Sequence, residues 1–336
     1  MKTPRVASPE VVILRALLEV GDGFVSGTAL AHTLKMSRVA IWQHMEKLRE
    51  DGFTFETARA KGYRLSARPD ALNAALILAT LPPSHAGRFT LDVRDELDST
   101  NDEVARELAA GRNAPFAIIA RRQTKGRGRL GRRWLSEATG NLYVSLGFRP
   151  PLAPARMGMF TLWTGASLCK FIGTFCRTEA RLKWPNDLLL DGRKIGGILT
   201  EARIDADQMR DLVIGIGVNL VPPAGGWPTE LRAHATSLSE QVSTPIDANR
   251  FAAALLGCLL TAYERFVDGS FRNTFADLWN QFDALRGREI TVLHGDHRIT
   301  GTARGIDDAG LLLLRTPAGK TERYHAGEVS IAKPTF

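Results

Sequence analysis

The sequence has little that could hold a structural metal. Its 336 residues contain three cysteines, Cys169, Cys176 and Cys258, and none of them forms a CxxC pair. The seven histidines make no HExxH motif, and no group of histidines and cysteines has zinc-ligand spacing. We therefore expect no structural transition metal, and the odd number of thiols suits a reducing cytoplasm.

Targeting and membrane-spanning signals are also missing. The first residues, MKTPRVASPE, lack the apolar core of a signal peptide. No run of about 18 apolar residues is available to span a bilayer. We expect a cytoplasmic protein without membrane contact.

The composition is that of a globular protein with an excess of positive charge. Hydrophobic residues make up 44% and charged residues 24% of the chain, as is usual in folded domains. A chain of 336 residues is expected to form two or three domains, because single cores rarely grow past roughly 250–300 residues. The net charge of +8 permits a nucleic-acid or nucleotide-phosphate partner without establishing one.

Residues 8–66 have the pattern of three helices followed by a β-hairpin. PEVVILRALLEV has helical apolar spacing, Ser26 can cap the next helix, and Met36-Ser37 makes a tight turn before RVAIWQHMEKLRED. The alternating segment FTFETARAKGYRLSA predicts a two-stranded wing, so the order is that of a winged helix-turn-helix. The apolar stripe expected on the third helix consists of Val39, Ile41, Trp42, Met45 and Leu48.

Two interpretations of this N-terminal region stay open, a DNA-binding domain and a small protein-interaction domain. Ten Lys/Arg against seven Asp/Glu in residues 1–66 give an excess of only +3, which does not separate the two. The helix–turn–helix–wing order favours DNA, with the third helix in the major groove and the wing on phosphates. The candidate DNA contacts are Ser37, Arg38, Gln43, His44, Lys47 and Lys61.

The rest of the chain divides into a mixed α/β region and a β-rich tail. Between about 89 and 285, apolar strand-like runs such as NLYVSLGF alternate with long helical ones such as ANRFAAALLGCLLTAYERFV. From about 287, short alternating strands with Gly/Asp turns predict a small SH3-like β-barrel. We expect an α+β multidomain protein with domains at 1–67, 68–286 and 287–336.

A basic, glycine-containing stretch, RRQTKGRGRLGRRW at 121–134, carries seven cations and no acid. It matches neither the Walker A motif nor the dinucleotide fingerprint. It lies within roughly twenty residues for which no regular structure is expected, and loops of that length are usually functional or disordered. A solvated basic loop and a lid over a polyanion are both compatible with it. In a lid, Arg127 and Arg129 could bind phosphate or carboxylate oxygens.

Three further segments are ambiguous when each is taken alone. LDSTNDEV, residues 97–104, could do no more than cap a helix. The segment 181–202 combines a Trp-Pro turn with Lys194 and with Gly196-Gly197, where a flat ligand could lie against the backbone. VIGIGVNL, residues 213–220, has the pattern of a buried strand broken by glycines.

Taken together and in order, these segments carry a specific resemblance. LDSTN, QTKGRGRLGRRW, KWPNDLLLDGRKIGGIL and GIGVN resemble the biotin–protein ligases over nearly the whole chain. The preceding HTLKMSRVAIWQHMEKLREDGF and KGYRL resemble the bifunctional members that also repress the biotin operon. Lipoate–protein ligases share the central fold, but this sequence has the biotin-type loop and KWPND. The resemblance implies a central catalytic domain with the α/β fold of biotin and lipoate ligases.

The resemblance also implies a reaction and roles for residues. Biotin and ATP, with Mg²⁺, would form biotinoyl-5′-AMP, and biotin would then pass to a lysine of a biotin carboxyl carrier protein. The implied catalytic residues are Lys194, Arg129 and Asp187, with Asp187 also as the Mg²⁺ ligand. The implied biotin-binding residues are Ser99, Thr100, Asn101, Gln123, Arg127, Gly128, Arg129 and Lys194. The implied ATP-binding residues are Arg127, Arg129, Trp134, Lys183, Asn186 and Asn219.

Two other functions compete with this one. A DNA-binding regulator that only senses biotin would not need a charge-rich lid beside KWPND. A ligase whose N-terminal domain no longer binds DNA is compatible with the small charge excess of that domain. If DNA binding is retained, the resemblance implies operator DNA as a partner and a homodimer when the adenylate is bound.

Overall fold

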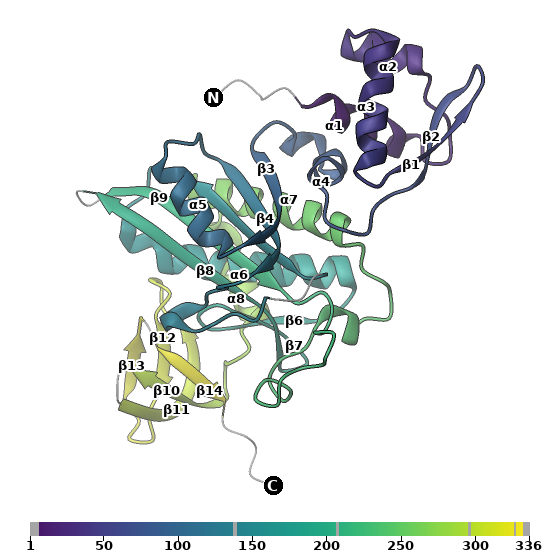
Figure 1. Ribbon diagram of the computed structural model, residues 1–336. Coiled ribbons are helices and arrows are strands. Elements are labelled where there is room, and N and C mark those ends of the chain that lie inside the picture. The colour runs from purple at the N-terminus through teal and green to yellow at the C-terminus, as the bar shows by residue number, and fades with distance from the viewer. Residues whose placement is uncertain (1–6, 137–139, 206–207, 295–296, 326, 332–336) are drawn as a thin grey trace.

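In the computed structural model, the described residues are 7–136, 140–205, 208–294, 297–325 and 327–331. They form an N-terminal helical region, a central α/β region and a small C-terminal sheet (Figure 1). This order confirms the expected α+β multidomain architecture.

The N-terminal region is a winged helix-turn-helix, as predicted. Each of its three helices begins after a serine whose side chain accepts a backbone N–H: Ser8, Ser26 and Ser37. Such capping satisfies donors that a helix start would otherwise leave unpaired. The elements are α1 (Pro9–Glu19), α2 (Gly27–Leu34), α3 (Arg38–Glu50) and the wing strands β1 (Thr54–Ala58) and β2 (Gly62–Ala67).

The apolar stripe expected on α3 is only partly buried. Ile41, Met45 and Leu48 are at most 1% exposed and pack against α1 and α2. Val39 and Trp42 were expected on the same stripe, but they are 66% and 53% exposed. The difference follows from helix geometry, because residues three or four apart share a face and Ile41, Met45 and Leu48 already complete the inner one.

A short helix, α4 (Ala74–Thr80), joins the first two regions. Leu76 and Ala79 belong to the N-terminal core, whereas Ile77 belongs to the core of the central region. Asn249 of the central region fastens the segment before α4, because its side chain accepts from the backbone N–H of Asn73 at 2.8 Å. We therefore expect the first two regions to be coupled mechanically through α4.

The central region is built on a seven-stranded sheet in the order β3-β4-β5-β9-β8-β7-β6. β3 and β4 are parallel, and each of the other neighbouring pairs is antiparallel. The strands are β3 (Thr90–Leu97), β4 (Phe116–Gln123), β5 (Leu142–Phe148), β6 (Ala180–Lys183), β7 (Asp187–Leu190), β8 (Arg193–Asp205) and β9 (Gln208–Val218).

Part of the basic stretch belongs to this sheet. Arg121 and Arg122 lie in β4 and form ion pairs with Asp95 and Glu96 of the adjacent strand β3. The loop after β4 therefore starts at residue 124, later than the sequence indicates.

Helices cover both faces of the central sheet (Figure 1). α6 (Met157–Cys176), α7 (Ala248–Val267) and α8 (Arg272–Phe282) build the large core on one face. α5 (Thr100–Ala109) covers the other face with a smaller core that contains Val104 and Leu108. Because α5 begins directly after β3, its first residues lie above β5 and β9 in the middle of the sheet.

The C-terminal region is a five-stranded antiparallel sheet in the order β13-β12-β11-β10-β14. It docks on the central region where the indole Nε1 of Trp184 donates to the carbonyl of Gly310 at 3.1 Å. The strands are β10 (Glu289–His294), β11 (His297–Ile306), β12 (Leu312–Arg315), β13 (Thr321–Tyr324) and β14 (Glu328–Ile331). In the part of the chain that the structure describes, no helix has the length and apolarity needed to cross a membrane.

Candidate active site

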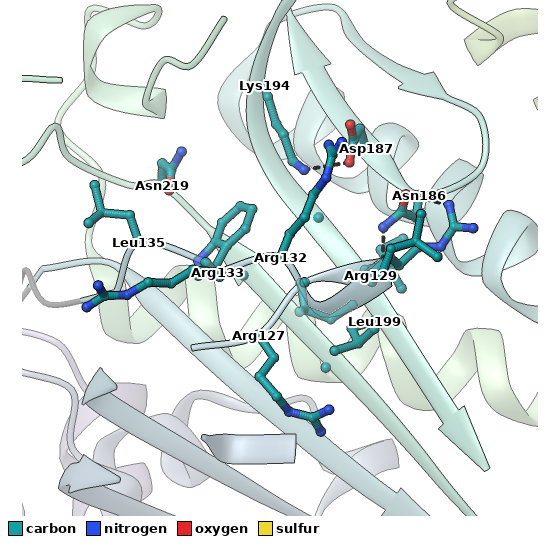
Figure 2. Close-up of a pocket in the computed structure, with 18 of the residues that line it drawn as sticks. Arg127, Arg129, Arg132, Arg133, Leu135, Asn186, Asp187, Lys194, Leu199 and Asn219 are labelled. Carbon is teal, nitrogen blue, oxygen red and sulfur yellow. Dashed lines mark hydrogen bonds and ion pairs between the residues drawn. The ribbon is translucent and has the colours of Figure 1, made fainter. Parts of the chain in front are cut away.

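A cavity of about 340 Å³ opens over the middle of the central sheet (Figure 2). The start of α5, the loop after β4, the β6–β7 turn, β8, β9 and the C-terminal region all contribute to its lining. The structure brings together in this lining all thirteen predicted ligand-binding residues: Ser99, Thr100, Asn101, Gln123, Arg127, Gly128, Arg129, Trp134, Lys183, Asn186, Asp187, Lys194 and Asn219.

One end of the cavity has a buried polar floor, formed where α5 begins. Ser99 caps the helix by accepting from the backbone N–H of Asp102. The backbone N–H and the hydroxyl of Thr100 both donate to Oε1 of Gln123, at 2.8 and 3.1 Å. Ser99, Thr100 and Gln123 are at most 6% exposed. Their polar groups are thus held in place within the protein before any ligand arrives.

Asn101 is fixed from two sides by residues that the sequence analysis missed. Its Oδ1 accepts from the hydroxyl of Ser145 at 2.6 Å, and its Nδ2 donates to Oε2 of Glu201 at 2.6 Å. A Cβ on Gly215 would lie 2.0 Å from Oδ1 of Asn101, so only glycine leaves room for this amide. Ser145 is the one serine in the apolar segment NLYVSLGF, and a small hydroxyl among large apolar side chains was a usable signal.

The loop after β4 folds back on itself as a hairpin, although the sequence indicates no regular structure there. Trp134 donates its backbone N–H to the carbonyl of Gly126 at 2.8 Å, and Gly128 donates to that of Arg132 at 2.7 Å. A Cβ on Gly126 would lie 2.6 Å from the carbonyl oxygen of Trp134. The glycine therefore permits the two arms of the hairpin to approach.

Arg127 points away from the other cations of the loop (Figure 2). Its guanidinium forms ion pairs with Asp102 at 2.6 Å and with Glu201 at 2.9 Å. Arg127 also lines the cavity, and its contact with biotin or ATP stays a prediction. Because Glu201 also holds Asn101, Arg127 links the loop to the polar floor.

Arg129 points toward Asn186 of the β6–β7 turn, and Arg132 of the same loop points toward Asp187 (Figure 2). Its Nη1 lies 3.5 Å from Oδ1 of Asn186, and Nδ2 of Asn186 donates to the carbonyl of Ile198 at 2.8 Å. Burial lowers the pKa of Arg129, against the opposing effect of the nearby Asp187 carboxylate. The guanidinium is therefore a half-buried cation whose desolvation an anion in the cavity would offset.

Lys194 and Asp187 form the second charged group of the cavity. Nζ of Lys194 lies 2.6 Å from Oδ1 of Asp187 and 5.2 Å from the ring centroid of Trp134. Asp187 begins β7 directly after the KWPN turn, and Lys194 is the second residue of β8. The turn between the two strands thus brings these opposite charges together.

Trp134 occupies the surface where the sequence suggested a flat ligand. Its indole lies against Gly197 and Gly217, and a Cβ on Gly217 would be 2.7 Å from the ring. Gly196 instead faces Leu188 and the carbonyl of Gly217. Among the residues that the structure describes, the buried indole Nε1 has no hydrogen-bond partner. A ligand that reaches it can therefore gain a hydrogen bond.

The segment 221–237 forms one wall of the cavity, and the sequence analysis assigned it no role. Trp227, Leu231 and Ala235 line this wall. Nδ2 of Asn219 donates to the carbonyl of Thr236 at 3.1 Å, so this predicted ATP ligand also holds the segment in place. No motif marks the segment, because its contribution is apolar surface and not chemistry.

A resident metal centre does not fit the residues of the cavity. Among the described residues, no group of three or more His, Cys, Asp or Glu side chains could hold a metal ion. Asp187 is the one carboxylate in the described lining. A single carboxylate does fit a Mg²⁺ ion that arrives bound to nucleotide phosphates, because phosphate oxygens and waters then supply the other ligands.

The predicted DNA contacts fall into two groups in the structure. Arg38, Gln43 and Lys61 are exposed, and Ser37 caps α3. His44 and Lys47 contact the buried carboxylate of Glu10 at 3.1 and 2.8 Å. Although burial opposes it, hydrogen bonding, first of all from Lys47, lowers the pKa of Glu10 to about 2. His44 and Lys47 therefore also fasten α3 to α1.

The fold and the site together define a protein that joins a winged helix-turn-helix to an α/β domain with a cationic, polar-floored cavity. Residues 95–219 match the biotin/lipoate A/B protein ligase family, 286–331 the biotin protein ligase C-terminal domain, and 12–64 an HTH domain. The bifunctional ligase/repressor BirA of Bacillus subtilis is 33% identical over 94% of this chain and 96% of its own length. The corresponding protein of Escherichia coli is 33% identical over 95% of this chain and 96% of its own length. The chain belongs to the biotin–protein ligase family.

The solved structures agree with this assignment. The biotin protein ligase of Aquifex aeolicus, in complex with biotin and ATP, is 30% identical with a TM-score of 0.62. The match covers 73% of this chain and 99% of that one.

Proposed function

We propose that this protein is an ATP-dependent biotin–protein ligase and also a biotin-responsive repressor. As a ligase, it forms biotinoyl-5′-AMP and transfers biotin to a lysine of a biotin carboxyl carrier protein in the cytoplasm. The observation that carries this proposal is the cavity, in which a buried polar floor lies beside Arg129 and Lys194. The proposed domains are a DNA-binding domain at 1–67, a catalytic domain at 68–286 and a small β domain at 287–336.

The first step joins two anions, so the site must supply positive charge. A carboxylate oxygen of biotin attacks the α-phosphorus of ATP, the bond from that phosphorus to the bridging oxygen breaks, and pyrophosphate leaves. Lys194 and Arg129 stabilise the charge that builds up on the phosphate oxygens. Asp187 orients Lys194 through their 2.6 Å ion pair and offers a carboxylate oxygen to Mg²⁺ that arrives with ATP.

The second step needs a protected mixed anhydride and no nucleophile from the protein. The amine of the acceptor lysine attacks the biotinoyl carbonyl, AMP leaves with the bonding electrons, and the new amide nitrogen loses a proton. Until then, the loop after β4 and Trp134 keep water from the adenylate. The polar floor of Ser99, Thr100 and Asn101 binds the ureido end of biotin and fixes its orientation.

Transfer of labelled biotin to an isolated biotin carboxyl carrier domain tests the ligase activity. We expect transfer that depends on ATP and releases pyrophosphate. Formation of neither adenylate nor pyrophosphate, together with tight biotin binding, would instead identify a DNA-binding sensor of biotin.

Repression is the second proposed function, and the winged helix-turn-helix is the observation that favours it. A symmetric dimer would present two copies of α3 to a palindromic site. If the adenylate orders a surface used in pairing, it stabilises the dimer and tightens operator binding by linkage. Sedimentation with and without biotin plus ATP tests this, and a monomer under both conditions rejects it.

Glu201 should hold the loop to the polar floor during catalysis. We expect Glu201→Gln to release biotinoyl-5′-AMP up to about fivefold faster, because exposed ion pairs such as the one with Arg127 typically contribute about 0.2–1 kcal/mol. Rapid-dilution measurement of the dissociation rate checks this. Glu103→Gln is the matched control, since Glu103 pairs with Arg106 on α5, outside the cavity lining. Equal rates in the two variants would rule out the link.

A further inference from the structure

An apolar patch lies at the start of α3 and is not used by the core. Six large hydrophobic side chains are exposed in the described part of the chain, and three of them, Met36, Val39 and Trp42, fall within seven consecutive residues. Their exposed fractions are 36%, 66% and 53%. Single exposed apolar residues are ordinary on protein surfaces. Three on one short segment indicate a surface that another molecule covers.

The patch is on the outward face of the helix. Val39 and Trp42 are three positions apart, so they are neighbours on one face. Arg38 lies one turn before Trp42, Gln43 lies one turn after Val39, and both are exposed. The opposite face is the buried one that packs on α1 and α2. The patch therefore lies on the face of α3 opposite the core of the N-terminal region. Figure 1 shows where α3 lies.

Positive charge frames the patch. Lys35 and Arg38, which are exposed directly beside Met36 and Val39 in the chain, form this cationic frame. Glu46, one turn after Trp42, forms an ion pair with Arg49. An apolar centre within a cationic frame suits a polyanion that carries apolar groups. Duplex DNA is such a molecule, because each thymine displays a methyl group in the major groove.

We propose that Val39 and Trp42 recognise thymine methyl groups in the major groove, and so determine which sequences the protein prefers. This inference rests on the proposed repressor function. It adds two apolar residues to the polar candidates, such as Arg38 and Gln43, that would otherwise determine the sequence preference. The cations of the frame bind phosphates and position α3.

Replacement of thymine by deoxyuridine tests the proposal with a minimal chemical change. Duplexes that the full chain binds in the presence of biotin and ATP are selected from a random library. Each thymine of the best duplex is then replaced by deoxyuridine, which pairs in the same way but lacks the methyl group. At contacted positions we expect binding to weaken about fourfold for each methyl that a side chain buries. All titrations use one salt concentration, because phosphate contacts make affinity salt-dependent.

A double-mutant cycle connects the methyl groups to the named side chains. We expect Trp42→Ala and Val39→Ala to weaken binding of the thymine duplex and to be insensitive to deoxyuridine at the position each side chain contacts. Val20→Ala is the matched control, because Val20 is 45% exposed in the same region but lies after α1. An unchanged helical circular dichroism signal and melting temperature in each variant show that the N-terminal region stays folded.

The possible negative results distinguish a failure of this inference from a failure of the proposed repressor function. A selected site whose affinity is unaffected by deoxyuridine at every thymine overturns the inference and leaves DNA binding in place. Trp42→Ala and Val39→Ala with wild-type DNA affinity also overturn it and assign the patch to a protein partner. If no sequence can be selected, both the inference and the repressor function fail, while the ligase assay stands independently.

Discussion

Replacing Lys194 with alanine is expected to slow formation of biotinoyl-5′-AMP by about 10²–10³-fold, the typical cost of removing one preorganised electrostatic contact. Lys194 is half-buried, lies beside Asp187 and lines the cavity in which the proposed reaction brings carboxylate and phosphate together. Its removal also takes away the 2.6 Å ion-pair partner of Asp187, and Arg129 remains as a cation near this carboxylate.

Pre-steady-state release of pyrophosphate is the measurement that isolates this step. Arg193→Ala is the matched control, because Arg193 precedes Lys194 in β8 and is absent from the described cavity lining. Pyrophosphate release by Lys194→Ala at a near wild-type rate would contradict the role assigned to this lysine.

The order of the domains and the location of the cavity could be predicted from the sequence because both depend on local signals. Serine caps, a tight turn at Met36-Ser37 and an alternating wing specify the N-terminal fold within about sixty residues of chain. The LDSTN, GRGR and KWPND segments are also short. Their residues converge because each segment follows a strand of the same central sheet. Their binding roles stay predictions.

The direction of individual side chains could not be predicted, because it depends on partners far away in the sequence. Arg127 turns toward Asp102 and Glu201, and the second of these is 74 positions further along the chain. Nothing in GRGR distinguishes this arginine from Arg129. Likewise, Lys47 looks available to DNA until α1 places the carboxylate of Glu10 at 2.8 Å from its amine.

The burial of apolar residues on α3 illustrates the same limit. Val39 and Trp42 fit a helical apolar repeat as well as Ile41 and Met45 do. Which of the overlapping repeats faces the core is decided by the positions of α1 and α2, and therefore by tertiary packing. The mismatch between pattern and burial is itself informative, since it identifies the patch that we assign to DNA.

Arg129→Gly is expected to release biotinoyl-5′-AMP about 10- to 100-fold faster than the wild type, while adenylate still forms. A hydrogen bond to a charged group contributes about 1.5–3 kcal/mol, and Arg129 is the half-buried loop cation directed at the β6–β7 turn. Glycine also adds backbone freedom to the hairpin, which favours the open loop.

Two further variants separate the loss of charge from the gain in flexibility. Arg129→Met removes the guanidinium and keeps a side chain, so it should reproduce most of the effect. Leu130→Gly adds freedom beside an intact arginine, and because Leu130 is 74% exposed with φ of 56°, glycine fits that backbone without strain. We expect little change in this variant. Dissociation of preformed adenylate after rapid dilution is measured for all three. Fast release by Leu130→Gly together with slow release by Arg129→Met would contradict this prediction. The loop would then act through its stiffness, and the guanidinium of Arg129 would have no direct part in holding the intermediate.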